Sequence, residues 1–245
     1  MGEVIAVVSG KGGTGKTTVC AGVATCLAAD GKRVLCIDGD IGLHNLDIAL
    51  GMSELPIVAF TDVARGHYSL ADAAVHPRLE NLALLTAPVR ENEENIDAAA
   101  FGRLLAEARE RFDYCLIDAP AGVGTGFRLA TRFTDRFLVV ATPDPSSMRD
   151  AGCVADLLTL DGKEELHLVV NRVLPRLVRR MELTVDDMMD DVGLPLLGLI
   201  PEDAAVMLAA AGGNALIFFS GGGAAEACLR ISRRLRGVAM PLMKF

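Results

Sequence analysis

The chain has 245 residues, of which 51% are apolar, enough to fill one sizeable hydrophobic core. Its 32 acidic and 24 basic side chains give a formal charge of −8; this charge repels phosphate backbones at long range and argues against a dedicated nucleic-acid-binding protein. The six cysteines form no C-x-x-C pair and the N-terminus lacks the pattern of a secretory signal, so we expect reduced thiols and a cytoplasmic protein.

Short runs of apolar residues recur along the chain and predict strands. Runs that are apolar at every position are typical of parallel strands covered on both faces by helices. The predicted strands are residues 4–8, 34–37, 82–85, 115–117, 137–141, 166–170 and 196–200.

Segments with helical periodicity lie between these strands. In the first of them, Val19, Val23 and Leu27 recur every four residues. The others are residues 101–112, 126–132, 146–160, 185–191, 204–211 and 224–236. The alternation predicts an α/β fold, a doubly wound and mostly parallel sheet of about seven to eight strands with helices on both faces. No repeat or long linker divides the chain, so we expect a single domain over residues 1–245.

Residues 204–225 contain no charged side chain and are long enough to span a bilayer. Glycines at 212–213 and 221–223 interrupt this segment. We therefore expect a short helix, a turn, an apolar run at 216–219 and a loop, rather than a membrane-spanning helix.

The strongest motif is a phosphate-binding loop between the first predicted strand and the first predicted helix. Gly10, Gly15, Lys16 and Thr17 fit the pattern G-x-x-x-x-G-K-[ST]. Glycines let the backbone turn its N–H groups toward an anion, and the helix N-terminus favours negative charge. Lys16 is expected to reach the β- and γ-phosphates, and Thr17 to ligate Mg²⁺. We predict that ATP or ADP is bound by Gly12, Gly13, Thr14, Gly15, Lys16, Thr17 and Thr18.

Carboxylates follow two of the predicted strands. Asp38 and Asp40 come after residues 34–37, and Asp118 comes after residues 115–117. The carboxyl ends of parallel strands meet at one edge of a sheet, so these side chains are expected near the phosphates. Asp118 has the position of a Walker B aspartate, which holds Mg²⁺ directly or through water. Each acid could instead cap a helix or form a turn.

Polar residues also follow two later strands. Asn171 and Arg172 close the run 166–170, and Pro201 and Asp203 follow the run 196–200. An asparagine amide can pair with both a donor and an acceptor on adenine. A lone asparagine after a strand is more often a turn former, so the residues alone leave both readings open.

Residues 11–17, Lys-Gly-Gly-Thr-Gly-Lys-Thr, resemble the deviant Walker A motif of the MinD/ParA family of P-loop ATPases. In that family the lysine at the place of Lys11 crosses a dimer interface to the partner's nucleotide. Residues 38–47 resemble the first switch of the family and residues 119–124 its second switch. Two further stretches that resemble the family are residues 142–150 and 197–203. The resemblance thus covers nearly the whole chain.

The resemblance implies residue roles beyond the phosphate loop. Catalysis would involve Lys11, Lys16 and Asp40, with Asp40 orienting the attacking water. Asn171 would read adenine, Arg172 would lie near the base, and Pro201 and Asp203 would contact its edge. The implied Mg²⁺ ligands are Thr17, Asp40 and Asp118.

The resemblance also implies a function. The protein would be a homodimeric switch that binds and hydrolyses ATP with Mg²⁺, recruits a partner such as a MinC-like protein, and acts in division-site selection or another kind of spatial positioning. The alternatives are a FlhG-like flagellar-number regulator, a ParA-like partition ATPase, and a scaffold that binds nucleotide without turnover. The acidic charge counts against DNA as a partner.

The end of the chain departs from the family pattern. Related proteins of the MinD type typically end in an amphipathic membrane-binding helix, whereas residues 237–245 form only a short tail that contains Pro241. We expect this tail to pack on the domain, with a weak attachment to anionic lipid as the alternative. The expected location is the cytoplasm, at most peripheral to the inner face of the cell membrane.

Overall fold

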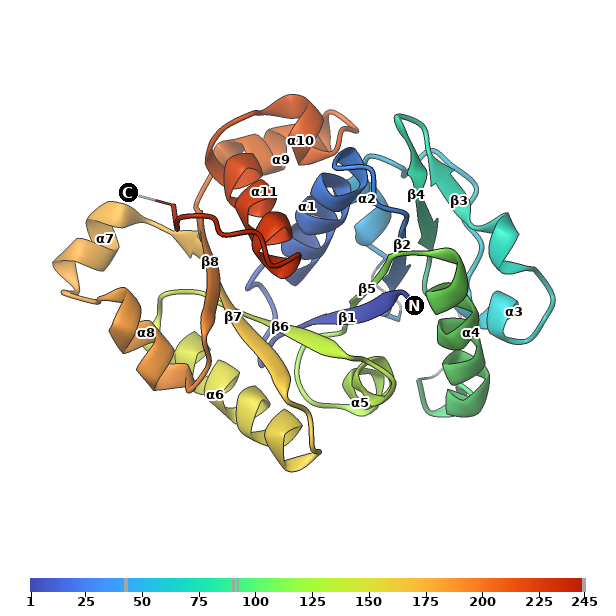
Figure 1. Ribbon diagram of the computed structural model, residues 1–245, viewed down its shortest axis with the longest axis horizontal. Helices are drawn as coiled ribbons and strands as arrows, with labels where there is room; N and C mark the ends of the chain where they lie inside the picture. Colours follow the sequence, from blue (N-terminus) through green and yellow to red (C-terminus); the bar gives the residue numbers. More distant parts are fainter. Residues whose placement is uncertain (42–43, 90, 92, 244–245) are drawn as a thin grey trace.

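The computed structural model describes residues 1–41, 44–89, 91 and 93–243, and in this part of the chain an eight-stranded sheet forms the centre (Figure 1). The strand order is β3-β4-β2-β5-β1-β6-β7-β8. Every neighbouring pair is parallel except β3 and β4. The strands are β1 Glu3–Val8, β2 Val34–Asp38, β3 Ala74–His76, β4 Leu79–Leu85, β5 Tyr114–Asp118, β6 Arg136–Ala141, β7 Glu165–Val173 and β8 Leu196–Pro201. The predicted doubly wound fold is confirmed.

Helices cover both faces of this sheet, as Figure 1 shows, with α1, α2 and α9 to α11 on one side and α4, α5, α6 and α8 on the other. Alternate residues of each strand supply the two cores, so Val4 and Ala6 pack on the α4–α6 side while Ile5 and Val7 pack against α1 and α11. The helices are α1 Lys16–Ala29, α2 Leu46–Leu50, α3 Phe60–Ala64, α4 Ala98–Arg111, α5 Thr125–Arg132, α6 Pro145–Leu160, α7 Pro175–Arg180, α8 Val185–Val192, α9 Ala204–Ala211, α10 Leu216–Phe219 and α11 Gly223–Leu235.

Several elements differ from the sequence-based expectation. The short helices α2, α3 and α7 and the antiparallel edge strand β3 were not predicted, because elements of three to six residues are too short to show a period. The run 216–219 forms the one-turn helix α10. Strand β7 continues to Val173, so the prediction that Asn171 and Arg172 follow the strand is wrong; both lie within it, at a register irregularity against β8.

No helix among the described residues is both long enough and apolar enough to cross a membrane. The described part of the C-terminal tail lies against α11. There the Arg230 guanidinium donates a hydrogen bond to the Pro241 carbonyl at 3.0 Å. The Arg234 guanidinium donates another to the Met240 carbonyl at 3.1 Å. The side chains of Leu242 and Met243 also pack against the core.

The contact between β8 and α11 gives a test of the packing. A Cβ added to Gly198 would lie 2.4 Å from Cγ1 of Ile231, which is buried. Gly198→Ala is therefore expected to lower the free energy of unfolding by about 1–3 kcal/mol, because overpacking forces the helix away from the sheet. Urea unfolding followed by circular dichroism measures this change. Gly221→Ala is the matched control, since nothing lies within 4 Å of its added Cβ; equal unfolding midpoints for the two variants would contradict the packing.

Candidate nucleotide-binding site

The predicted phosphate loop connects β1 to α1 at the carboxyl edge of the sheet. Gly13 and Gly15 have φ angles of +82° and +87°, in the left-handed region that favours glycine. Gly15 precedes the first residue of α1 and no side chain caps the helix there. The N–H groups of the first helical turn are therefore available to an anion.

Lys16 and Thr17 begin α1 and face the acidic residues of the neighbouring strands. Lys16 is buried, and burial lowers the pKa of its ammonium, although Asp118 and Asp40 act in the opposite direction. The Thr17 side chain forms a hydrogen bond with Asp118. The lysine thus supplies a positive charge inside a poorly solvated site, where it interacts strongly with phosphate.

Two buried carboxylates stand side by side at the ends of β2 and β5. The parallel register aligns Asp38 with Asp118. Burial is the main cause that raises the pKa of Asp118 to about 7; the nearby Asp38 and Asp40 act in the same direction, and the hydrogen bond with Thr17 and the charge of Lys16 oppose them. Oδ1 of Asp118 is buried and has no hydrogen-bond partner among the described residues. Three carboxylates face one buried lysine here, and an unpartnered carboxylate oxygen suits Mg²⁺, so Thr17, Asp40 and Asp118 fit the metal that the sequence predicted there.

Asp38 organises the loop that follows β2. Its carboxylate accepts hydrogen bonds from the backbone N–H groups of Asp40 at 3.0 Å, Asn45 at 3.2 Å and Leu46 at 3.1 Å. Burial raises the pKa of Asp38, whereas these three N–H groups lower it. Gly42 and Leu43 of the predicted first switch lie outside the described residues. Asp38 therefore holds both ends of this loop to β2.

Asp40 is the carboxylate of this group that remains partly exposed. Burial raises its pKa, and Lys16 opposes the rise. The side chain consequently lies close to the Lys16 charge and is still accessible to water. This is the environment that a residue orienting a water molecule requires.

Lys11 is engaged with its own chain in this structure. Its ammonium donates to Oδ1 of Asp144 at 3.1 Å and to Oγ of Ser146 at 2.7 Å. Partial burial raises the pKa of Asp144, but hydrogen bonds from Thr142, Ser146, the Ser147 N–H and Lys11 hold it well below the usual range. Lys11 is thus held at the N-terminus of α6, which Asp144 caps.

A cavity of about 240 Å³ beside the phosphate loop brings together the residues predicted to hold the base. Asn171 Nδ2 donates to the Thr14 carbonyl at 2.8 Å, which leaves the amide oxygen for a ligand. A Cβ on Gly15 would lie 2.2 Å from the same nitrogen, so this contact requires glycine. The cavity is lined by Gly13, Gly15, Thr18, Asn171, Arg172, Pro201, Glu202, Asp203, Val206 and Met207.

Two of the predicted base contacts have additional structural roles. Arg172 has a φ of +58°, and its Nε donates to Glu202 Oε2 at 2.7 Å across the mouth of the cavity. The Asp203 carboxylate accepts hydrogen bonds from the backbone N–H groups of Ala205 and Ala224, both at 2.9 Å. It therefore connects the first turns of α9 and α11. A left-handed arginine is strained by about 1–3 kcal/mol, and such strain is commonly found at functional sites.

Sequence reasoning missed two residues of this cavity, Val206 and Met207. The signal was present in the sequence, because Val206 and Met207 stand three and four positions after Asp203 and therefore share its helix face. Both residues lie in the uncharged segment 204–225, where no charged side chain marks a contact with a ligand.

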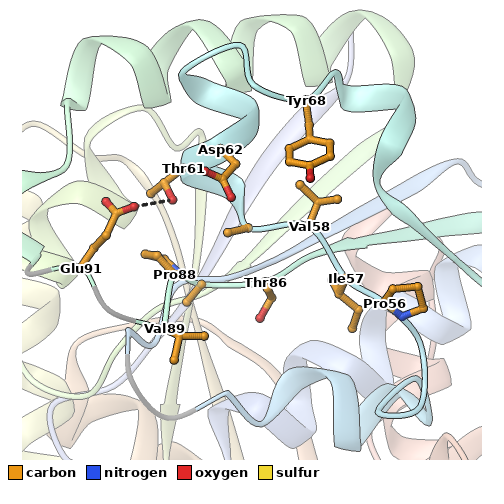
Figure 2. Close-up of a pocket in the computed structure, with 12 residues that line it drawn as sticks. Pro56, Ile57, Val58, Thr61, Asp62, Tyr68, Thr86, Pro88, Val89 and Glu91 are labelled. Carbon is orange, nitrogen blue, oxygen red and sulfur yellow. Dashed lines mark hydrogen bonds between the residues drawn. The ribbon is translucent and has the colours of Figure 1, made fainter.

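A larger cavity, of about 490 Å³, lies beyond the first switch (Figure 2). It was not predicted. Figure 2 shows Glu91 directed toward Thr61, whose hydroxyl donates to it at 3.2 Å. Thr86, another lining residue, forms a 2.7 Å hydrogen bond with Nδ1 of His44, which connects this cavity to the first switch.

Comparison with known proteins identifies the family. A model of the CobQ/CobB/MinD/ParA nucleotide binding domain matches residues 5–217. The septum site-determining protein MinD of Synechocystis is 36% identical over 100% of this chain and 93% of that protein, and that of Thermotoga maritima is 37% identical over 99% and 91%. The chain belongs to the MinD/ParA family.

Solved MinD structures agree with this assignment. The Aquifex aeolicus MinC:MinD cell division protein complex contains a chain with a TM-score of 0.91 and 35% identity, covering 99% of both chains. MinD of Pyrococcus horikoshii complexed with Mg-ADP has a TM-score of 0.84 and 29% identity, covering 96% of both. Both the sequence and the fold of this MinD family member therefore match across nearly its full length.

The raised pKa of Asp118 gives a prediction for the protein free of nucleotide and Mg²⁺. Between the ordinary pKa of 3.8 and the folded value of about 7, the folded state keeps a proton that the unfolded state has lost. This group's contribution to stability therefore falls as the pH rises through that range. Asp118→Asn, which removes the buried charge, is expected to be more stable than the wild type at about pH 8, with a smaller advantage at about pH 5.

Differential scanning calorimetry in the presence of a chelator measures this difference. Glu80→Gln, an exposed carboxylate on β4, is the control and should give the wild-type melting temperature at both pH values. A stability difference between Asp118→Asn and the wild type that does not change with pH would contradict the assignment.

Proposed function

We propose that this protein is an ATP-dependent dimerising switch of the MinD type that acts in division-site selection. The observation that carries the proposal is the pair of lysines, Lys11 and Lys16, on one phosphate loop that faces the carboxylates Asp38, Asp40 and Asp118. The relatives support the proposal, since they include MinD bound to Mg-ADP and MinD in complex with MinC.

In the proposed reaction, the N–H groups of the loop and Lys16 bind the phosphates of ATP and stabilise the charge that develops as the γ-phosphoryl group leaves. Asp40 orients the attacking water in line with that group. Thr17, Asp40 and Asp118 would hold Mg²⁺, which would neutralise charge on the phosphate oxygens. The amide oxygen of Asn171 would accept a hydrogen bond from the adenine amino group.

Dimerisation in this proposal depends on Lys11. To reach a partner's nucleotide, the side chain must leave Asp144 and Ser146 of its own chain. Both members of the ion pair are more than a third exposed, at 37% for Lys11 and 48% for Asp144. An exposed pair of this kind contributes only about 0–1 kcal/mol. The contact can therefore be released when the γ-phosphate and a second subunit are present.

The ATP-bound dimer is proposed to recruit a MinC-like protein and to release it after hydrolysis. Residues 1–245 are proposed to act as one unit in the cytoplasm, at most peripheral to the membrane, with DNA not used as a partner.

Substitution of each lysine by alanine is expected to abolish a different property, nucleotide binding for Lys16 and ATP-dependent dimerisation for Lys11. Lys16→Ala should abolish binding of a fluorescent ATP analogue, because the buried cation on the phosphates is lost. Lys11→Ala should retain binding but remain monomeric with ATP, as measured by light scattering. An ATP-dependent dimer of Lys11→Ala would refute the cross-subunit role of this lysine.

Turnover separates a switch from a scaffold that only binds nucleotide. Asp40→Ala should retain ATP binding and lose at least about 100-fold in phosphate release, since the water is no longer oriented. Glu54→Ala, which removes an exposed carboxylate in the turn after α2, is the matched control. If the wild type released no more phosphate than Asp40→Ala, the scaffold would be the better description.

A further inference from the structure

The connection from β4 to α4 makes side-chain contacts next to both stretches that resemble the family's switches. At its start, the Thr86 hydroxyl and Nδ1 of His44, a residue of the first switch, form a 2.7 Å hydrogen bond. Further along, Glu93 begins a single 3₁₀ turn that packs against α5, the helix that follows the second switch. Glu93 belongs neither to the phosphate loop nor to the carboxylates at the strand ends.

The Glu93 carboxylate caps α5 from outside the helix. The N-cap residue of α5 is Gly124, which has no side chain to accept a hydrogen bond. Oε2 of Glu93 instead accepts one from the backbone N–H of Gly126 at 2.8 Å. An anionic acceptor at the first turn also interacts favourably with the helix dipole. The end of the second switch is therefore held by a side chain that stands 33 positions earlier in the sequence.

The surroundings of Gly126 are closely packed. A Cβ added there would lie 2.6 Å from Cγ of Pro120, in the second switch, and 2.9 Å from Oε1 of Glu93. The middle of the same switch is joined to the strand that leads into the phosphate loop, because the Gly122 N–H donates to the Ser9 carbonyl at 3.1 Å. A displacement of Glu93 would therefore change how the second switch sits beside the phosphates.

Glu93 is also close to Asp40, the residue expected to orient the attacking water. Burial is the main cause of the raised pKa of Asp40, and the negative charge of Glu93 adds to the rise, whereas Lys16 and His44 oppose it. Charges influence each other in this way only at short range. One side chain is thus near the first switch and hydrogen-bonded to the start of α5.

We propose that Glu93 is a positioning residue for ATP hydrolysis, which holds the end of the second switch in place beside Asp40. It would act through the backbone at the start of α5 and would touch neither the nucleotide nor the attacking water. Its loss should therefore slow the chemical step more than it weakens nucleotide binding. This role rests on the proposed ATPase function and adds a residue to it.

A purely structural cap offers a matched control. Asp97 is the N-cap of α4, and its carboxylate accepts a hydrogen bond from the backbone N–H of Ala99 at 2.8 Å. The hydrogen bond reaches the second residue of the helix, as that of Glu93 does, and the ion-pair partner of Asp97, Arg103, lies on the same helix. Loss of either cap is expected to lower the melting temperature. Only the loss of Glu93 should also slow hydrolysis.

Steady-state phosphate release by the full chain with Mg²⁺ and ATP tests the role. Glu93→Ala is expected to lower kcat about tenfold or more while KM for ATP changes less than about threefold. Glu93→Gln should restore kcat to within about threefold of the wild type, because its amide oxygen can accept the same N–H. Asp97→Ala should leave both constants unchanged.

A second measurement does not depend on turnover. Hydrogen–deuterium exchange of residues 120–128 reports how firmly the second switch and the start of α5 are held. A non-hydrolysable ATP analogue with Mg²⁺ should slow this exchange in the wild type and in Glu93→Gln, and clearly less in Glu93→Ala. Gly126→Ala, whose added Cβ would displace the carboxylate, should behave as Glu93→Ala does in both measurements.

Three results would overturn the proposal. They are a wild-type kcat for Glu93→Ala, an equal loss of kcat in Glu93→Gln and Glu93→Ala, and a loss in Asp97→Ala that matches the loss in Glu93→Ala. The last result would mean that reduced stability alone slows the reaction. Failure of the proposed function looks different: the wild type itself would release no phosphate, and the role of Glu93 in hydrolysis would fall with it.

Discussion

The alignment of Asp38 with Asp118 at the ends of adjacent parallel strands is the constraint on which the site depends. Two buried carboxylates at neighbouring positions, with Asp40 close by, repel each other, and Lys16 is the buried cation set against them. Burial raises the pKa of all three acids, and for Asp118 the charges of Asp38 and Asp40 add to this rise. A protein that retains such an arrangement is adapted to bind a further cation, and a bound polyphosphate then accounts for the lysines on the facing loop.

The same constraint also positions the loop that follows β2. Asp38 cannot leave the strand end, so its hydrogen bonds to Asp40, Asn45 and Leu46 tie the first switch to the charge of the site. Lys11 and Arg172, by contrast, are held by exposed acids, Asp144 and Glu202. The centre of the site is therefore held by hydrogen bonds of a buried carboxylate, whereas the ion pairs of its two outer cations are exposed and contribute little free energy.

Much of the fold and of the candidate site could be predicted from sequence, for identifiable physical reasons. Strands buried on both faces produce unbroken apolar runs, and a phosphate loop needs glycines and a lysine at fixed spacing, so β1, α1 and Lys16 left clear patterns. β3 and α7 could not be predicted in this way, because three to six residues are too few to show the hydrophobic periodicity of a strand or a helix. The continuation of β7 through Asn171 depends on pairing with β8, and the Lys11 contact joins residues more than a hundred positions apart. Neither is encoded locally.

The central claim is that the buried carboxylates and the phosphate loop form one site for a divalent cation and a nucleotide together. The most direct measurement is the melting temperature of the full chain with Mg²⁺ alone, with ATP alone and with both. The account predicts a rise with both that exceeds the sum of the separate rises, because each ligand neutralises charge that opposes the other. Additive rises, or none, would contradict it.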